Sequence, residues 1–285
     1  MSEIPLTFVC RPRPYPDESL LSYLLRVQFA NRYDALIWLT WWLRGLSHVS
    51  GSRSQFRPTA TNETTFLENL ATVSKVPVLE LYQMTLNRYA TIYTFPGRPI
   101  HDQRLSSGEQ VAFWQQSHSL KSWSRTDAQS AFCPLCLRER VYHRLPWLLH
   151  AVFACPTHNC WLRDSCSNCG ASVSVEMIVR SQCAACCASL TDMPVIPLDA
   201  TVADVQKHLI FCLETGTRPT DTLPQLSVQA LFRVVDGLCA ATRQLGWDWE
   251  GCYQPVDVTQ LLFPLRSQYS ATPMQYGCLY TTAWH

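Results

Sequence analysis

CPLC (133–136), CPTH (155–158), CSNC (166–169) and CAAC (183–186) are four short turns that follow one another closely in the chain. Each turn carries cysteine or histidine at its first and fourth positions, so that both side chains can reach one metal ion. Thiolate and imidazole are the ligands that Zn²⁺ prefers, and four of them complete a tetrahedral structural site. The four turns therefore predict two structural zinc ions.

The pairing of the turns is open from the sequence alone. Sequential pairing closes shorter loops and is favoured, whereas an interleaved pairing would join the first turn to the third. The expected ligands are Cys133, Cys136, Cys155 and His158 for one ion, and Cys166, Cys169, Cys183 and Cys186 for the other. Cys187 is an alternative to Cys186 as the last ligand, and Cys160 is a weaker substitute.

The four turns do not match the motifs of known catalytic sites. A zinc ion with four protein ligands has no open position for substrate or water. A zinc deaminase requires H-x-E before its cysteine pair, but His158 is followed by Asn159 and Cys160. The sequence contains no phosphate-binding loop, no G-x-S-x-G and no H-E-x-x-H. We therefore expect no enzymatic activity, and we expect the scattered histidines to be surface or capping residues: His101, His118, His143, His150 and His208.

Composition limits the class of protein. Hydrophobic residues make up 47% of the chain and charged residues only 16%, so we expect part of the surface to pack on a partner. No apolar run is long enough to span a bilayer, and the N-terminus lacks the pattern of a signal peptide. Fourteen cysteines then indicate metal binding in a reducing compartment. We expect a cytoplasmic protein with no membrane partner.

Charge is unevenly distributed along the chain. Residues 1–58 and residues 98–144 each carry a net charge of +3, and residues 192–262 carry −5. The pI of about 7.5 is below that of an autonomous DNA-binding protein. Weak phosphate contacts are expected from four arginines: Arg125, Arg138, Arg140 and Arg144.

Helical periodicity predicts a mainly α fold in which small zinc-binding knuckles are embedded. We expect an N-terminal helical domain (1–94), a connector (95–130), the double zinc region (131–191) and C-terminal helices (192–285). The connector has few apolar repeats, and we expect one short helix within it, at about residues 108–117. At the C-terminal end, Thr201 is expected to cap a helix that ends at Gly216, and Ser227 to cap one that ends near Gly246.

In the N-terminal domain, the expected helix caps are Asp17, Asp34 and Asn62. The segments 62–74 and 77–86 have the proportions of a helix-turn-helix, although an ordinary helical hairpin is preferred because the second helix carries little positive charge.

Three tryptophans follow in the second predicted helix. Trp38, Trp41 and Trp42 share one helical face, since they lie three and four residues apart. One interpretation places this face in the core. The other makes it an interface, because tryptophan is enriched at interface hot spots.

Two segments resemble a known family. RPRPYPDESLLSYLLRV (11–27) and the stretch from CPLC to CPTH (133–158), followed by CSNCG (166–170), are similar to the TniQ/TnsD family of transposon target-site selection proteins, most like the TniQ of CRISPR-associated transposons. The resemblance implies a non-enzymatic adaptor, often dimeric, whose partners are an RNA-guided CRISPR effector complex with its guide RNA, the transposon's AAA+ regulator and target DNA within that complex. The alternative is a TnsD-type protein that reads its target DNA directly.

Overall fold

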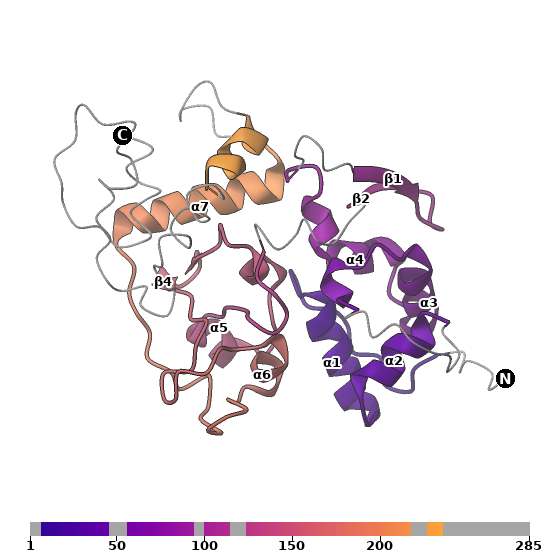
Figure 1. The fold of residues 1–285 in the computed structure, drawn as a ribbon, viewed down its shortest axis with the longest axis horizontal. Coiled ribbons are helices and arrows are strands. Elements are labelled where there is room, and N and C mark those ends of the chain that lie inside the picture. The colour runs from indigo at the N-terminus through magenta and orange to yellow at the C-terminus, as the bar shows by residue number, and fades with distance from the viewer. Residues whose placement is uncertain (1–6, 46–55, 94–99, 115–123, 218–226, 236–285) are drawn as a thin grey trace.

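The computed structural model describes residues 7–45, 56–93, 100–114, 124–217 and 227–235 (Figure 1). As predicted, the described chain is mainly helical with few strands. None of the described helices is both long enough and apolar enough to span a membrane. The N-terminal helices and the zinc region form two neighbouring lobes in Figure 1, and one long helix lies along the top of the second lobe.

Four helices build the N-terminal lobe: α1 (Leu20–Asn31), α2 (Leu36–Leu43), α3 (Thr64–Ser74) and α4 (Val78–Gln83). Single turns of 3₁₀ helix stand at η1 (Pro58–Ala60) and η2 (Leu86–Tyr89). In α3, apolar residues three and four positions apart form one buried face, as helical periodicity requires: Phe66, Leu67, Leu70 and Val73. This face packs in one core with residues of α1, α2 and α4.

The predicted caps of these helices are wrong. Asp17 has a φ of 55°, and α1 begins three residues later, after the N-cap Ser19, whose side chain accepts a hydrogen bond from the Ser22 backbone. α2 begins after Ala35 and α3 after Glu63, neither of which makes a side-chain cap.

The connector contains a β-hairpin where a short helix was expected. β1 (Ile100–Arg104) pairs antiparallel with β2 (Gln110–Trp114), and Gly108, with a φ of 101°, closes the turn through its N–H to the Leu105 carbonyl. Leu105, Val111 and Phe113 are buried in the N-terminal core. The helix prediction failed because a short apolar run suits a strand as well as a helix, and here the core decides.

The zinc region consists mostly of turns and short elements: α5 (Pro134–Glu139), η4 (Leu145–Leu148), β3 (Ala154–Cys155), β4 (Cys160–Trp161) and α6 (Val175–Arg180). β3 and β4 form a two-residue antiparallel ladder. Buried apolar side chains between these elements form a second core, which continues into the C-terminal helices.

The helix α7 (Ala200–Thr215) is fixed to the zinc region by Gln206. The buried amide oxygen of Gln206 accepts hydrogen bonds from the backbone of Phe153 at 2.9 Å and Ala154 at 3.1 Å. The helix ends at Gly216 as predicted, but it begins at Ala200, so Thr201 lies inside it. Ser227 caps the next helical segment, with its hydroxyl 3.1 Å from the Ala230 backbone nitrogen. The expected end near Gly246 lies outside the described residues.

A buried carboxylate organises the N-terminal segment 11–27. Glu18 has no exposed surface, and it accepts hydrogen bonds from the Ser22 hydroxyl at 2.7 Å and the Tyr15 backbone at 3.0 Å. Its other contact is an ion pair of 2.5 Å with Arg26, whose guanidinium also lies 3.8 Å from the centre of the Tyr15 ring. Burial raises the pKa of Glu18, and Arg26 opposes this shift.

The same segment docks the N-terminal lobe on the zinc region. Backbone hydrogen bonds run from Ser19 to the His143 carbonyl at 2.9 Å and from Leu145 to the Asp17 carbonyl at 2.6 Å. The His143 backbone also donates to the Ser22 hydroxyl at 3.1 Å. The polar residues of segment 11–27 therefore join two parts of the chain that are far apart in sequence.

Candidate zinc sites

The structure pairs the four turns sequentially. The ligand atoms of Cys133, Cys136, Cys155 and His158 all lie within 4.8 Å of one another, and so do those of Cys166, Cys169, Cys183 and Cys186. The pairing left open by the sequence is therefore resolved, and each set can hold one zinc ion.

The distances within each set fit tetrahedral zinc. Zn–S bonds of about 2.3 Å separate two sulfurs of one ion by about 3.8 Å. The observed separations are 3.5 Å for Cys136 and Cys155, 3.6 Å for Cys166 and Cys186, and 3.7 Å for Cys169 and Cys183. Protein atoms fill all four positions, which is the arrangement of a structural site.

In the first site, His158 faces the sulfurs with Nδ1. This nitrogen lies 3.3 Å from Cys136 Sγ, 3.4 Å from Cys155 Sγ and 3.5 Å from Cys133 Sγ. The other ring nitrogen, Nε2, lies 2.9 Å from Oε1 of Glu139. A carboxylate that holds the second nitrogen of a metal-binding histidine selects the tautomer and orients the ring.

Helix α5 explains this geometry. Cys133 is its N-cap, Pro134 opens the first turn, and the Cys136 backbone donates to Cys133 Sγ at 3.5 Å. Glu139 follows Cys136 by three residues and therefore lies on the same helical face. Sequence reasoning missed Glu139, although its spacing from the second cysteine was a usable signal.

Each of the three zinc-binding turns after CPLC is followed by a residue whose backbone has the left-handed conformation. Asn159, Gly170 and Cys187 follow the last ligand of their turns with φ values of 47°, 74° and 59°, and each donates its N–H at 2.9 Å to the carbonyl of the first ligand. Cys187 is thus exposed at the position that glycine occupies in the preceding turn. It lies outside the ligand set, which settles the identity of the last ligand as Cys186.

Cys160 is a neighbour of the first site. Its Sγ lies 3.5 Å from Cys133 Sγ, yet Cys160 does not belong to the set of four mutually close ligands. Hydrogen bonding to Cys133 raises the pKa of the Cys160 thiol, so that this residue stays a neutral donor. Hydrogen bonding within the cluster, chiefly with Cys136, lowers the pKa of Cys133, and the same hydrogen bond raises the pKa of Cys136.

A buried histidine lies outside both sites. His143 was expected at the surface, but it is fully buried, with Nδ1 2.8 Å from Ser19 Oγ and Nε2 2.6 Å from Ser130 Oγ. Burial lowers its pKa to about 3, with a smaller contribution from Arg125. The imidazole is neutral and serves to join the two lobes.

The sequence model of the TniQ family matches residues 9–162. The match begins before the docking segment 11–27 and runs through the first zinc site to Leu162. This chain belongs to the TniQ family. Membership makes it a transposition-associated protein, as the resemblance implied. Among curated proteins, no sequence matches it. The second zinc site and α7 lie beyond the matched part of this TniQ chain.

The four arginines expected to contact DNA differ in their surroundings. In this TniQ protein, Arg125 directs Nη1 at the backbone carbonyls of Trp147, Leu149 and Val152, at 3.0, 2.5 and 3.2 Å. These hydrogen bonds give the guanidinium a structural part in the zinc region. Arg138 and Arg140 are exposed.

The other arginines pack on neighbouring groups. Arg138 Nε donates to the Thr191 carbonyl at 2.6 Å, and the Arg140 guanidinium lies 4.8 Å from the centre of the Tyr15 ring. Arg144 is half-buried, at 5.4 Å from the ring centre of Tyr142. Arg138 and Arg140 are thus the two most exposed of the four arginines.

The three tryptophans of α2 do not lie in the core as one stripe. The buried residues of this helix are Leu39, Thr40 and Leu43, whereas Trp38 is 53% exposed. Trp41 packs edge-on against Trp38 with ring centres 5.3 Å apart. Trp42 is partly buried and packs against the N-terminal core, so the three tryptophans divide between the core and the surface.

Proposed function

We propose that this TniQ protein is a non-enzymatic adaptor that links an RNA-guided CRISPR effector complex to the transposon's AAA+ regulator during target-site selection. It would act in the cytoplasm, as a dimer, with target DNA held in the assembled complex. Membership of the TniQ family supports this proposal, and the closed coordination of both zinc sites supports its non-enzymatic part. Each ligand set is complete within the chain, so bound zinc has a structural part to play and the surface is left for partners.

The helix pair α3–α4 supports an adaptor over a direct DNA reader. α4 has six residues, and its exposed side chains are Glu80 and Gln83. The two other polar candidates for base contact are engaged elsewhere: Asn87 is buried, and Arg88 pairs with Asp17 at 2.9 Å. A recognition helix requires several groups that can reach bases and phosphates.

Co-purification tests the proposal. The tagged full-length chain is isolated from its host with and without nuclease, and bound proteins and nucleic acids are identified. We expect effector subunits with guide RNA, together with the AAA+ regulator. Recovery of the regulator and DNA without guide RNA, combined with nanomolar binding of one duplex at physiological salt, would overturn the proposal in favour of a TnsD-type reader.

A further inference from the structure

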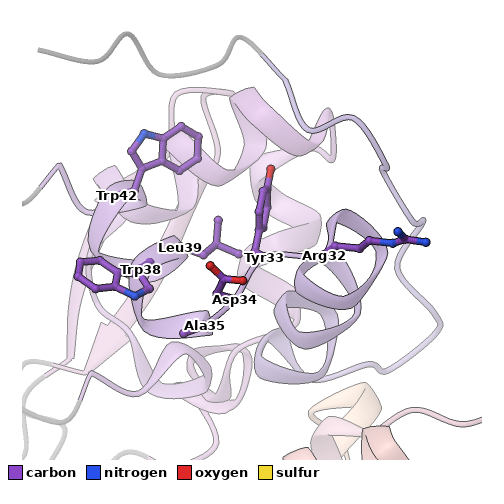
Figure 2. A pocket seen from close by; sticks show the side chains of 7 residues that line it. All are labelled: Arg32, Tyr33, Asp34, Ala35, Trp38, Leu39 and Trp42. Atoms are coloured by element: carbon purple, nitrogen blue, oxygen red, sulfur yellow. The ribbon is translucent and has the colours of Figure 1, made fainter.

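A pocket of about 360 Å³ opens where α1 passes into α2 (Figure 2). Three aromatic side chains and one carboxylate dominate its lining. The lining residues are Arg32, Tyr33, Asp34, Ala35, Trp38, Leu39 and Trp42.

The aromatic walls are supported from behind. The buried ring of Phe8 lies 6.2 Å from Tyr33 and 6.4 Å from Trp42, measured between ring centres. Trp41 supports Trp38 in the same way at 5.3 Å. Rings that are packed on one side and exposed on the other lose little conformational entropy when they bind a ligand.

The loop between the helices is also held in place. Gln28 forms two hydrogen bonds with the Tyr33 backbone. The Gln28 backbone carbonyl accepts a hydrogen bond from the Tyr33 N–H at 3.1 Å, and the Gln28 side-chain amide donates one to the Tyr33 carbonyl at 3.2 Å. Arg32 ends α1 in the left-handed conformation, with a φ of 54°. The pocket is therefore preformed.

Asp34 supplies the only acidic group of the lining. It does not cap α2, and it forms no hydrogen bond or ion pair with the residues that the structure describes. Figure 2 shows its carboxylate among Trp38, Leu39 and Tyr33, while the guanidinium of Arg32 points away from it. The pocket thus combines aromatic faces with a carboxylate that has no ion-pair partner among the described residues.

This combination suits a cation. The face of an aromatic ring attracts positive charge, and a neighbouring carboxylate adds an ion pair. Arginine fits better than lysine because its planar guanidinium stacks on rings and forms two hydrogen bonds at once. Within this chain, guanidinium groups already stack on aromatic rings, with Arg26 3.8 Å from the ring centre of Tyr15 and Arg44 4.5 Å from that of Phe56.

We propose that this pocket binds an arginine side chain presented by a partner protein. The inference rests on the proposed adaptor function and assigns the chemistry of one of its docking contacts. Tryptophan and arginine are the residues that most often dominate binding energy at interfaces, and here the chain offers the aromatic half of such a pair.

A small-molecule probe tests the pocket independently of any partner. N-acetyl-arginine methylamide is titrated into the full-length protein while the indole N–H signals of Trp38 and Trp42 are followed by NMR. The neutral citrulline analogue is the control ligand. We expect saturable shifts, with the arginine probe bound about threefold more tightly or better than citrulline. Absence of saturable shifts, or equal binding of both probes, overturns the proposal.

Matched variants localise the effect. Asp34→Asn should remove the preference for arginine, whereas Asp102→Asn, the same change at an exposed carboxylate on β1, should retain it. Trp38→Ala removes a half-exposed wall and should weaken both probes. A preference for arginine that survives Asp34→Asn places the cation site elsewhere and overturns the proposal.

Co-purification separates this inference from the proposed function. If the wild type recovers partner proteins and Asp34→Asn loses them, the pocket is a docking site. If Asp34→Asn recovers them equally well, the inference fails while the adaptor function stands. If the wild type recovers none, the adaptor function fails, and the probe titration alone decides the pocket. A change in sedimentation of Asp34→Asn in isolation would identify a second copy of the chain as the occupant and overturn the partner assignment.

Discussion

His158 Nε2 lies 2.9 Å from Glu139 Oε1, and the opposite ring nitrogen faces three cysteine sulfurs. The carboxylate accepts the Nε2 proton and leaves Nδ1 free to bind the metal. Burial lowers the pKa of His158, but hydrogen bonds to Cys155 and then to Glu139 oppose this effect, and the pKa is raised overall. In an occupied site, a carboxylate in this position makes the imidazole a stronger ligand.

Glu139→Gln should weaken zinc binding at the first site by about tenfold, the lower end of the range for such partners because Glu139 is 58% exposed. Competition with a chromophoric chelator measures the affinity. Glu176→Gln changes a comparably exposed carboxylate that pairs with Arg180, and it should leave both sites unchanged. Equal affinities for Glu139→Gln and the wild type would show that the carboxylate has no influence on the metal.

Cys187→Gly should retain two zinc ions and stabilise the protein by about 1 kcal/mol, since glycine adopts positive φ without the steric cost of a side chain. Cys186→Ser, one residue earlier, should lose the second ion, because it removes a ligand. Metal analysis and urea unfolding measure both effects. Loss of zinc from Cys187→Gly would make Cys187 a ligand and contradict the structure.

The eight zinc ligands could be predicted because their signal is local. Two ligands in one four-residue turn require no knowledge of the rest of the fold, and sequential pairing follows from short loops. Glu139 could not be identified with the same certainty, since its contact depends on how α5 is oriented toward the third and fourth ligands. The burial of His143 depends on the docking of two distant segments, which no local pattern reports.

The β-hairpin and the helix caps could not be predicted either, because they too depend on contacts between distant parts of the chain. Val111 and Phe113 alternate as strand residues, but the run is too short to exclude a helix, and burial against Tyr82 and its neighbours decides the outcome. At the start of α1, both Asp17 and Ser19 can cap a helix. The Asp17 carbonyl accepts a hydrogen bond from the Leu145 backbone, and Ser19 is the residue that caps the helix.

Arg26→Met should destabilise the protein by about 3–5 kcal/mol, because it leaves the carboxylate of Glu18 buried without its charged partner. Glu18→Gln should lower the free energy of unfolding by less, since the Arg26 side chain is 15% exposed and can be hydrated. The double variant should recover part of the loss. Urea unfolding measures all three.

The cost of Arg26→Met should also decrease as pH falls. Burial raises the pKa of Glu18 and Arg26 opposes this shift, so removing Arg26 should raise the pKa further. Protonation of Glu18 in acid should therefore stabilise the folded variant more than it stabilises the folded wild type. Lys207→Met removes an exposed ion pair with Asp204 and serves as the control, with little change expected. A cost of Arg26→Met no larger than that of Lys207→Met would show that the Glu18 charge is solvated.

His143→Gln should change how stability depends on pH. In the folded protein the pKa of His143 is about 3, below the value of about 6.5 in the unfolded chain. The unfolded state therefore binds more protons between these values, and the contribution of neutral His143 is complete above about pH 6.5 and is lost as pH falls toward 3. By about pH 5.5 the loss should reach about 1.4 kcal/mol.

Protonation of the zinc ligands also destabilises the protein in acid, so the comparison must be between two chains that keep all eight ligands. Wild type and His143→Gln meet this condition, and their difference in unfolding free energy should narrow by about 1.4 kcal/mol between about pH 8 and about pH 5.5. An NMR titration of the His143 ring gives a second measure, with no inflection expected above about pH 5. A ring that titrates near pH 6.5 would mean that solvent reaches His143 and that Ser19 and Ser130 do not enclose it.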